Sequence, residues 1–292
     1  MSPRVRVLAG ATAAPSVLTI VGGVLDNLAL VAVGLALSSA GCALLLSVLI
    51  GAQRRTERVT LTKLRNLDRK LAPLVTDARR NRIALESELL TNQQAMDQLL
   101  SRFQPTAPLP VVAGWAMDPV GLLWLTDYIE QGRPDLIIEC GSGTSTLWMG
   151  FALRANGSGR LVSLDHHASF ARRTRELIER HGLSEWVEVR HSPLRPVETP
   201  RGEFQWYGVD PEDFGEIDLL VVDGPPATTG KHARYPALAL LGGHLSHNGA
   251  IIADDVDRIE EKEMIELWLA EDPALHRAGA KLGQRLQVLN RS

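Results

Sequence analysis

The strongest structural signal in the chain is the stretch Leu136-Ile137-Ile138-Glu139-Cys140-Gly141-Ser142-Gly143-Thr144-Ser145-Thr146. Its apolar, partly β-branched beginning predicts a buried parallel strand, and this strand ends in the acid Glu139. The two glycines that follow predict a tight turn whose backbone can approach a ligand closely. The hydroxyl side chains over residues 144–146 predict the capped start of a helix. A strand, a glycine turn and a helix in this order are typical of the first unit of a nucleotide-binding α/β sheet.

The spacing of the glycines indicates which kind of nucleotide this unit suits. The dinucleotide fingerprint is G-x-G-x-x-G/A, and Thr146 stands at its third glycine position. The glycine pattern therefore gives less support for a backbone that approaches a pyrophosphate closely. The acid Glu139 directly before the turn would repel a phosphate group, so the pattern favours a cationic ligand.

Acids recur at the ends of the predicted strands. Further strands are predicted over residues 160–165, 186–190, 217–222 and 249–253, and residues 276–289 can supply a short antiparallel pair at the sheet edge. The acids at the strand ends are Glu139, Asp165, Asp223 and the pair Asp254-Asp255. Open α/β sheets bind ligands at the carboxyl ends of their strands, so we expect these acids to share one hollow.

Three features leave alternatives open. Asp165 can accept hydrogen bonds from both hydroxyls of a ribose, or it can cap the helix that follows. His166 is included in the predicted ligand site, with a solvent-facing loop histidine as the alternative. Residues 204–207 and 210–214 are predicted as an irregular insertion, in which Trp206 and Tyr207 either line the substrate pocket or pack in the core.

The ordered motifs resemble the class I S-adenosylmethionine (SAM)-dependent methyltransferases, and especially small bacterial enzymes related to catechol O-methyltransferase. These motifs are E-C-G-S-G-T-S-T at 139–146, S-L-D at 163–165, H-S-P-L at 191–194, V-V-D-G-P-P at 221–226, R-Y-P-A-L at 234–238 and I-I-A-D-D-V-D-R at 251–258. Ser145 stands where the family usually has its third glycine. The resemblance covers residues 111–292 and implies an α/β fold, a Rossmann-like seven-stranded methyltransferase sheet with helices on both faces.

The resemblance also implies a SAM site. Glu139, Gly141 and Gly143 would meet the methionine part of SAM, Asp165 would bind the ribose, and Ser192 would border the adenine. The complete predicted cofactor-binding set is Glu139, Gly141, Ser142, Gly143, Asp165, His166, Ser192 and Asp223.

A divalent cation is the second cofactor that the resemblance suggests. In the catechol-type enzymes, acids matching Asp223 and Asp254 hold Mg²⁺ together with an amide at the next position, which is Asp255 here. Carboxylate oxygens suit such a hard ion, which would align an acceptor hydroxyl and lower its pKa. The family's catalytic lysine falls at Pro226, so either Lys231 or Asp223 is the predicted base. Without a metal, Asp223 is a plausible general base, and Asp254-Asp255 could instead cap a helix.

The N-terminal part of the chain is apolar enough to suggest a membrane anchor. Residues 28–50 contain no charged side chain and would form about 35 Å of helix, which is long enough to cross a bilayer. A second apolar run over residues 7–25 precedes them, and Asp26-Asn27 separates the two runs. Arginines flank both outer ends, which favours one or two transmembrane helices with both ends in the cytoplasm. A signal peptide and a buried core helix are the alternatives.

Residues 54–104 follow as a long predicted helix. Apolar residues recur there at alternating three- and four-residue spacings, which predicts a coiled coil and a homodimer formed through this segment, with Asn92 as a register-setting polar residue. A single amphipathic helix packed on its own domain is the alternative. The predicted domains are a membrane anchor over 1–53, a coiled-coil-like linker over 54–104 and the methyltransferase-like domain over 105–292.

Composition limits the function further. The net charge of −3 gives no electrostatic reason to expect nucleic-acid binding, and the two cysteines, 98 positions apart at Cys42 and Cys140, are not spaced as a metal site. We expect an O-methyltransferase of the cell (inner) membrane with its catalytic domain in the cytoplasm, acting on a small-molecule, glycan or lipid-linked acceptor. The alternatives are a nicotinamide-dependent enzyme on the same sheet and a catalytically silent membrane-bound scaffold.

Overall fold

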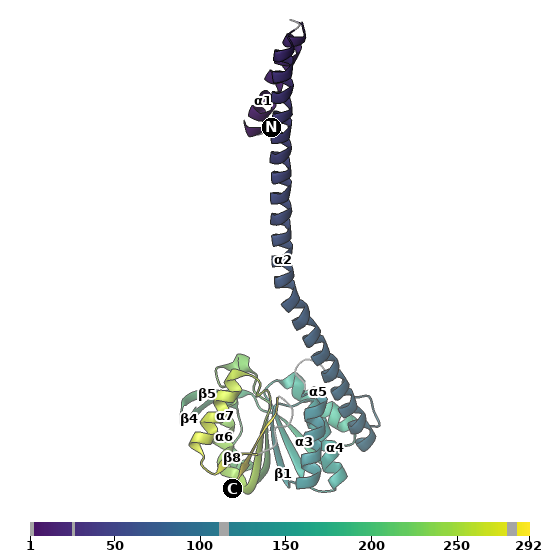
Figure 1. Ribbon diagram of the computed structural model, residues 1–292. Helices are drawn as coiled ribbons and strands as arrows, with labels where there is room; N and C mark the ends of the chain where they lie inside the picture. The colour runs from purple at the N-terminus through teal and green to yellow at the C-terminus, as the bar shows by residue number, and fades with distance from the viewer. Residues whose placement is uncertain (1–2, 25–26, 111–116, 279–284) are drawn as a thin grey trace. The chain divides into compact units, whose positions relative to one another are not determined.

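The computed structural model describes residues 3–24, 27–110, 117–278 and 285–292. The chain divides into two compact units, Met1–Ala84 and Leu85–Ser292. One continuous helix, α2 (Leu28–Phe103), contributes to both units, so the predicted anchor and the predicted linker belong to the same helix (Figure 1). The predicted domain boundaries after residues 53 and 104 stay predictions.

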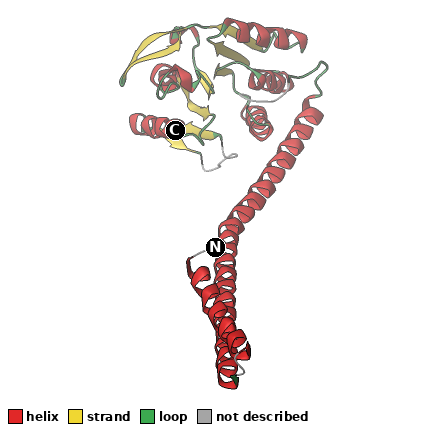
Figure 2. Ribbon diagram, turned by 90° about the horizontal axis from the view of Figure 1, so that it is seen from above, coloured by secondary structure: helices red, strands yellow, loops and turns green. Residues whose placement is uncertain are grey.

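The N-terminal unit contains α1 (Pro3–Val24) and the first part of α2, which lie alongside each other (Figure 2). A Cβ added at Gly34 would lie 2.7 Å from the backbone nitrogen of Thr19, and one at Gly22 would lie 2.8 Å from the Cβ of Leu30. These glycines therefore allow the two helices to approach closely. Within the described part of the chain, α2 is the one helix that is long and apolar enough to cross a membrane. Asp26, at the predicted break, lies outside the described residues.

The apolar residues of the predicted coiled coil differ in burial between the two ends of the segment. Those exposed on α2 include Leu61, Leu64, Leu71, Val75, Leu85 and Leu89. Leu99 and Phe103, by contrast, are buried in the core of the C-terminal unit, where the Phe103 ring lies 6.0 Å from that of Trp148. The last turns of the predicted linker therefore pack on the domain that follows, as the alternative interpretation expected.

The C-terminal unit is built on a seven-stranded sheet with the strand order β3-β2-β1-β6-β7-β9-β8. Its parallel strands are β1 (Leu136–Cys140), β2 (Arg160–Asp165), β3 (Val187–His191), β6 (Ile217–Val222) and β7 (Leu245–Ala253). The antiparallel strands are β9 (Gln287–Arg291), beside β7, and β8 (Leu275–Arg277), at the edge. The strand order reverses between β1 and β6, and such switch points are where open α/β sheets bind ligands.

Helices cover both faces of this sheet. One core cluster contains side chains of α3 (Pro119–Gly132), α4 (Thr144–Asn156) and α5 (Ala168–Arg180), and the other contains those of α6 (Pro236–Leu241) and α7 (Ile259–Glu271). Along β1, Ile137 joins the first cluster while Leu136 and Ile138 join the second, as the two-residue period of a strand requires. The two helix groups lie on opposite sides of the sheet in Figure 1, and the predicted Rossmann-like methyltransferase fold is confirmed.

One local prediction was wrong. Residues 204–207, predicted to be irregular, form part of an antiparallel hairpin of β4 (Leu194–Thr199) and β5 (Gly202–Tyr207). Pro196 weakens the strand signal because proline cannot donate to a ladder, yet it is tolerated in this two-stranded sheet. Gly202 makes the turn with a φ of +105°. Short 3₁₀ helices lie at Pro211–Asp213, Ala227–Thr229 and Gly242–His244.

Candidate active site

A buried acid organises the glycine turn after β1. Glu139 accepts hydrogen bonds from the hydroxyls of Ser145 (2.5 Å), Thr146 (2.6 Å) and Ser163 (2.5 Å), and its side chain is fully buried. The Thr146 hydroxyl in turn accepts a bond from the Gly143 N–H (2.8 Å). Burial raises the pKa of Glu139 to about 7, although the three hydroxyl groups lower it. The contacts of Glu139 thus tie the turn to α4 and β2, whereas its predicted contact with SAM stays a prediction.

The turn lies directly against the loop that follows β6. Gly141 has a φ of +106°, and a Cβ there would lie 3.3 Å from both the Asp223 carbonyl carbon and the Gly224 nitrogen. The Asp223 N–H donates to the Cys140 carbonyl (3.0 Å). Around Gly143, in contrast, an added Cβ would meet nothing within 4 Å. The turn therefore needs glycine at Gly141 for close backbone packing and leaves open space at Gly143.

Asp165, at the end of β2, is joined to the same turn. Its carboxylate accepts a bond from the Ser142 hydroxyl (2.5 Å) and another from the His167 N–H (2.8 Å) at the start of α5. The carbonyl of Asp165 accepts from the N–H of Ser192 (2.7 Å), and both side chains are buried. Burial lowers the pKa of the half-buried His166. The predicted cofactor residues from β1, β2 and β3 thus come together at one edge of the sheet, and the helix-cap contact of Asp165 also exists.

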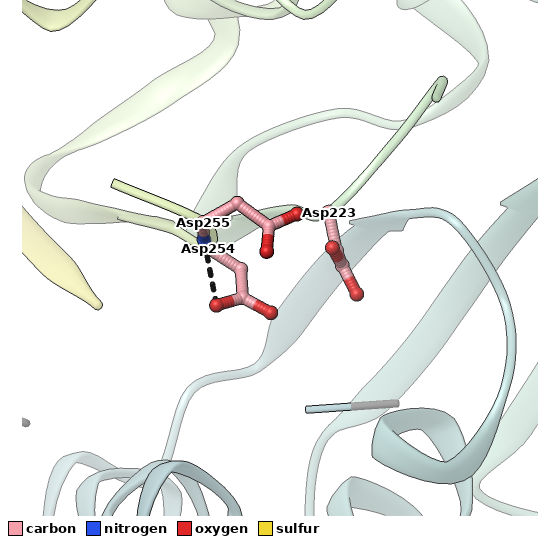
Figure 3. A group of neighbouring side chains, drawn as sticks. All are labelled: Asp223, Asp254 and Asp255. Carbon is pink, nitrogen blue, oxygen red and sulfur yellow. Dashed lines mark hydrogen bonds between the residues drawn. The ribbon is translucent and has the colours of Figure 1, made fainter. Parts of the chain in front are cut away.

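The acids at the ends of β6 and β7 also gather, as predicted. Asp223, Asp254 and Asp255 each place a carboxylate oxygen within 4.8 Å of the others (Figure 3). Burial, and then the neighbouring Asp254, raise the pKa of Asp223 well above its usual range. Burial raises the pKa of Asp254 to about 6, although its Oδ1 accepts the N–H of Asp255 (2.7 Å). The roles predicted for these three residues stay predictions.

An arginine with no role predicted from the sequence lies among these acids. The guanidinium group of Arg234 donates to Asp223 Oδ1 (3.2 Å), to Asp255 Oδ2 (2.8 Å) and to the Asp254 carbonyl (3.0 Å), and the residue is only 4% exposed. Burial alone would raise the pKa of Asp255, but Arg234 and its neighbouring guanidinium groups hold it below its usual range. The R-Y-P-A-L motif contains this residue, yet nothing in the local pattern indicates that it turns inward.

Lys231, one of the two predicted bases, lies elsewhere. Its side chain is 70% exposed, and its amine lies 3.6 Å from the carboxylate of Glu263. It lines a surface hollow of about 390 Å³ together with residues of β5 such as Phe204 and Gln205. None of the described strand-end acids lines this hollow. The structure therefore brings Asp223, but not Lys231, to the glycine turn.

Comparison with protein-family models gives one match, to a family described as a methyltransferase domain, over residues 138–256. The matched region is similar to a methyltransferase domain. It contains the glycine turn and all of the strand-end acids, and the prediction of a methyltransferase is confirmed. Comparison with curated proteins finds no match.

Several solved structures are similar in fold to the chain at low identity. An SAH-bound methyltransferase of Podospora anserina is 17% identical, with 69% of this chain and 87% of that chain covered and a TM-score of 0.48. An O-methyltransferase of Bacillus cereus in complex with SAH is 19% identical, with 68% and 91% covered and a TM-score of 0.47. The O-methyltransferase TomG of Streptomyces achromogenes, in complex with SAM, is 17% identical, with 69% and 89% covered and a TM-score of 0.45.

The hairpin places two aromatic side chains inside the methyltransferase domain. Trp206 and Tyr207 are both fully buried, and their polar atoms have no hydrogen-bond partner among the described residues. A Cβ added at Gly224 would collide with the Tyr207 hydroxyl and would lie 3.3 Å from the Cα of Gly141. The unpartnered hydroxyl of Tyr207 thus lies beside the glycine turn, a position that the sequence pattern could not reveal because the hairpin was not predicted.

Proposed function

We propose that this protein is a membrane-anchored SAM-dependent methyltransferase that methylates an oxygen atom of a small-molecule, glycan or lipid-linked acceptor. The observation that carries this proposal is the glycine turn at the switch point of the sheet, which has Asp165 on one side and Asp223 on the other. A cradle of this kind fits a ligand that combines a ribose with a positively charged group.

The residues around the turn fit SAM in several respects. Asp165 is positioned to accept hydrogen bonds from ribose hydroxyls, and the open space at Gly143 leaves room for a ligand above the backbone. The unpartnered hydroxyl of Tyr207 supplies a further donor beside the turn. When bound, SAM supplies a methyl group carried on a positively charged sulfur.

Asp223 is the base that the geometry favours. Its Oδ1 is bonded to Arg234, which fixes the carboxylate and leaves Oδ2 for an acceptor hydroxyl. In the transfer, Asp223 takes the proton of that hydroxyl while the oxygen forms a bond to the methyl carbon. Bound SAM would supply the methyl group, with the electron pair of its carbon–sulfur bond left on sulfur and SAH as the demethylated product. Lys231 has no place in this scheme.

The first part of α2 supports the proposed anchor. Apolar side chains between residues 28 and 50, such as Leu35, Leu44 and Leu46, are exposed on the helix, and burying them in lipid would remove this apolar surface from water. We propose that α2 crosses the inner membrane and that the methyltransferase domain lies in the cytoplasm. This location favours an acceptor that is itself linked to the envelope or to a lipid.

The exposed apolar positions between Leu61 and Leu89 support a homodimer formed through α2. Because Leu99 and Phe103 pack in the domain core, the dimer contact that we propose ends before them. Chemical cross-linking of the detergent-solubilised chain tests it, and we expect Leu64→Asp together with Leu71→Asp to reduce the dimer fraction. An unchanged dimer fraction would exclude this surface.

Calorimetry of the detergent-solubilised full chain with SAM and with SAH tests the proposed function. We expect saturable binding of both, and no binding of a nicotinamide cofactor. Incubation with radiolabelled SAM and fractionated membrane extract then tests transfer to an acceptor. Binding without transfer in any fraction would favour the silent scaffold, and an absence of SAM and SAH binding would exclude the proposed enzyme.

A further inference from the structure

The carboxylates at the ends of β6 and β7 are already paired with arginines. Asp255 Oδ2 lies 2.8 Å from nitrogens of both Arg234 and Arg258, and Asp255 Oδ1 accepts a hydrogen bond from Arg285. Arg285 also lies 4.0 Å from Asp254 Oδ1. Three carboxylates, those of Asp223, Asp254 and Asp255, therefore face three guanidinium groups, of which that of Arg258 also lies 3.8 Å from Glu261.

The predicted divalent cation does not fit this arrangement. A Mg²⁺ ion needs oxygen ligands with near-octahedral geometry. Both oxygens of Asp255, and Oδ1 of Asp223, already accept hydrogen bonds from arginines, while Oδ1 of Asp254 accepts the Asp255 N–H. An ion held by the remaining oxygens would also lie close to the buried guanidinium of Arg234, and like charges at such separations repel strongly away from bulk water.

We propose that Arg234 takes the place of the divalent cation and that the methyl transfer of this protein is metal-independent. Arg234 reaches the acids at the ends of two strands from the turn before α6, and its 4% exposure keeps its charge away from solvent screening. It acts as a positioning residue, since it fixes Asp223 by bonding one carboxylate oxygen and leaves the other to the acceptor. Arg is suited to this role because its planar guanidinium remains charged and binds several oxygens at once.

Measurement of Mn²⁺ binding tests this inference without any measurement of methyl transfer. The binding is monitored by electron paramagnetic resonance, as the decrease of the signal of the free ion. We expect the detergent-solubilised wild-type chain to take up no stoichiometric Mn²⁺. We expect Arg234→Met to expose the acids and to bind Mn²⁺ at least roughly tenfold more tightly than the wild type. Arg234→Lys, which keeps the positive charge, should behave like the wild type, and so should the control Arg195→Met, which changes an exposed arginine of β4.

The opposite results would overturn the inference. They are stoichiometric Mn²⁺ binding by the wild type that Asp254→Asn abolishes, or a folded Arg234→Met variant whose Mn²⁺ affinity is unchanged. If Arg234→Met does not fold, the wild type and Asp254→Asn decide the question between them. SAM binding measured with and without a chelator is a separate readout, and the failure of the proposed function would appear there as no SAM binding in either condition.

Discussion

Replacing Glu139 by glutamine should remove the part of the pH dependence of the domain's stability that arises from this buried acid. Burial raises the pKa of this acid from 4.5 to about 7 in the folded protein. The folded state therefore holds a proton that the unfolded state releases between these two values. The stability that this proton contributes is complete below about pH 4.5 and is lost as the pH rises through about 7.

The size of the effect follows from the shift in pKa. Each pKa unit corresponds to about 1.4 kcal/mol, so the loss amounts to roughly 3 kcal/mol over the whole range. Glutamine places an amide at the position of the carboxyl group and cannot ionise. The variant therefore does not lose this stability as the pH rises. We expect the difference in unfolding free energy between Glu139→Gln and the wild type to change by about 2–3 kcal/mol from about pH 5 to about pH 8, in favour of the variant at the higher pH.

Urea unfolding of the detergent-solubilised full chain, followed by tryptophan fluorescence, measures this difference. All six tryptophans of the chain lie after residue 114, so the signal reports the C-terminal unit rather than the N-terminal helices. The matched control is Glu198→Gln, which alters an exposed acid of β4 and should keep the wild-type profile.

A second variant examines one of the hydrogen bonds that oppose this rise in pKa. Ser163→Ala removes one of the hydroxyl donors to Glu139, and a hydrogen bond to a charged group is worth about 1.5–3 kcal/mol. We expect Ser163→Ala to destabilise the domain more at high pH, where Glu139 is ionised, than at low pH. Parallel pH profiles for the wild type and Glu139→Gln would refute the reasoning, because they would mean that Glu139 has the same pKa in the folded and unfolded states.

Three further predictions concern the glycine turn and its neighbours. Asp165→Ala should lower SAM affinity by about tenfold or more, since it removes the acceptor proposed for the ribose hydroxyls; calorimetry measures this, and an unchanged affinity would exclude that role. Gly141→Ala should lower the unfolding free energy, measured with urea, by about 1–3 kcal/mol, because the φ of this residue is +106° and the new Cβ would press on the Asp223 backbone. Gly143→Ala should lower it less, because there is open space around Gly143. Tyr207→Phe should leave the unfolding free energy unchanged or raise it, because the hydroxyl that it removes is buried without a hydrogen-bond partner. The same variant should bind SAM more weakly. An affinity for SAM equal to that of the wild type would show that this hydroxyl does not bind the ligand.

Local patterns in the sequence predicted the strands, the glycine turn and the acids at the strand ends. Each of these depends on neighbours in the chain: a buried parallel strand needs a short apolar run, and a tight turn needs glycine at a position such as Gly141. Once the strands are assigned to one parallel sheet, their carboxyl ends must meet at the same edge. The gathering of Asp165 and Asp223 at the glycine turn was therefore predictable, and so was the seven-stranded fold.

The tertiary structure alone decided which side chains complete the site. Lys231 and Arg234 lie three positions apart in one connection, yet the structure leaves Lys231 exposed and buries Arg234 among the acids. Arg234 meets an acid 21 positions away, and Arg285 meets the same acid from 30 positions away. Likewise, the hairpin of β4 and β5 brings Tyr207 to the glycine turn. The sequence did not predict this hairpin, because Pro196 weakens the strand signal. Such contacts depend on how distant segments fold back and bury charge together, and no local spacing of residues encodes that.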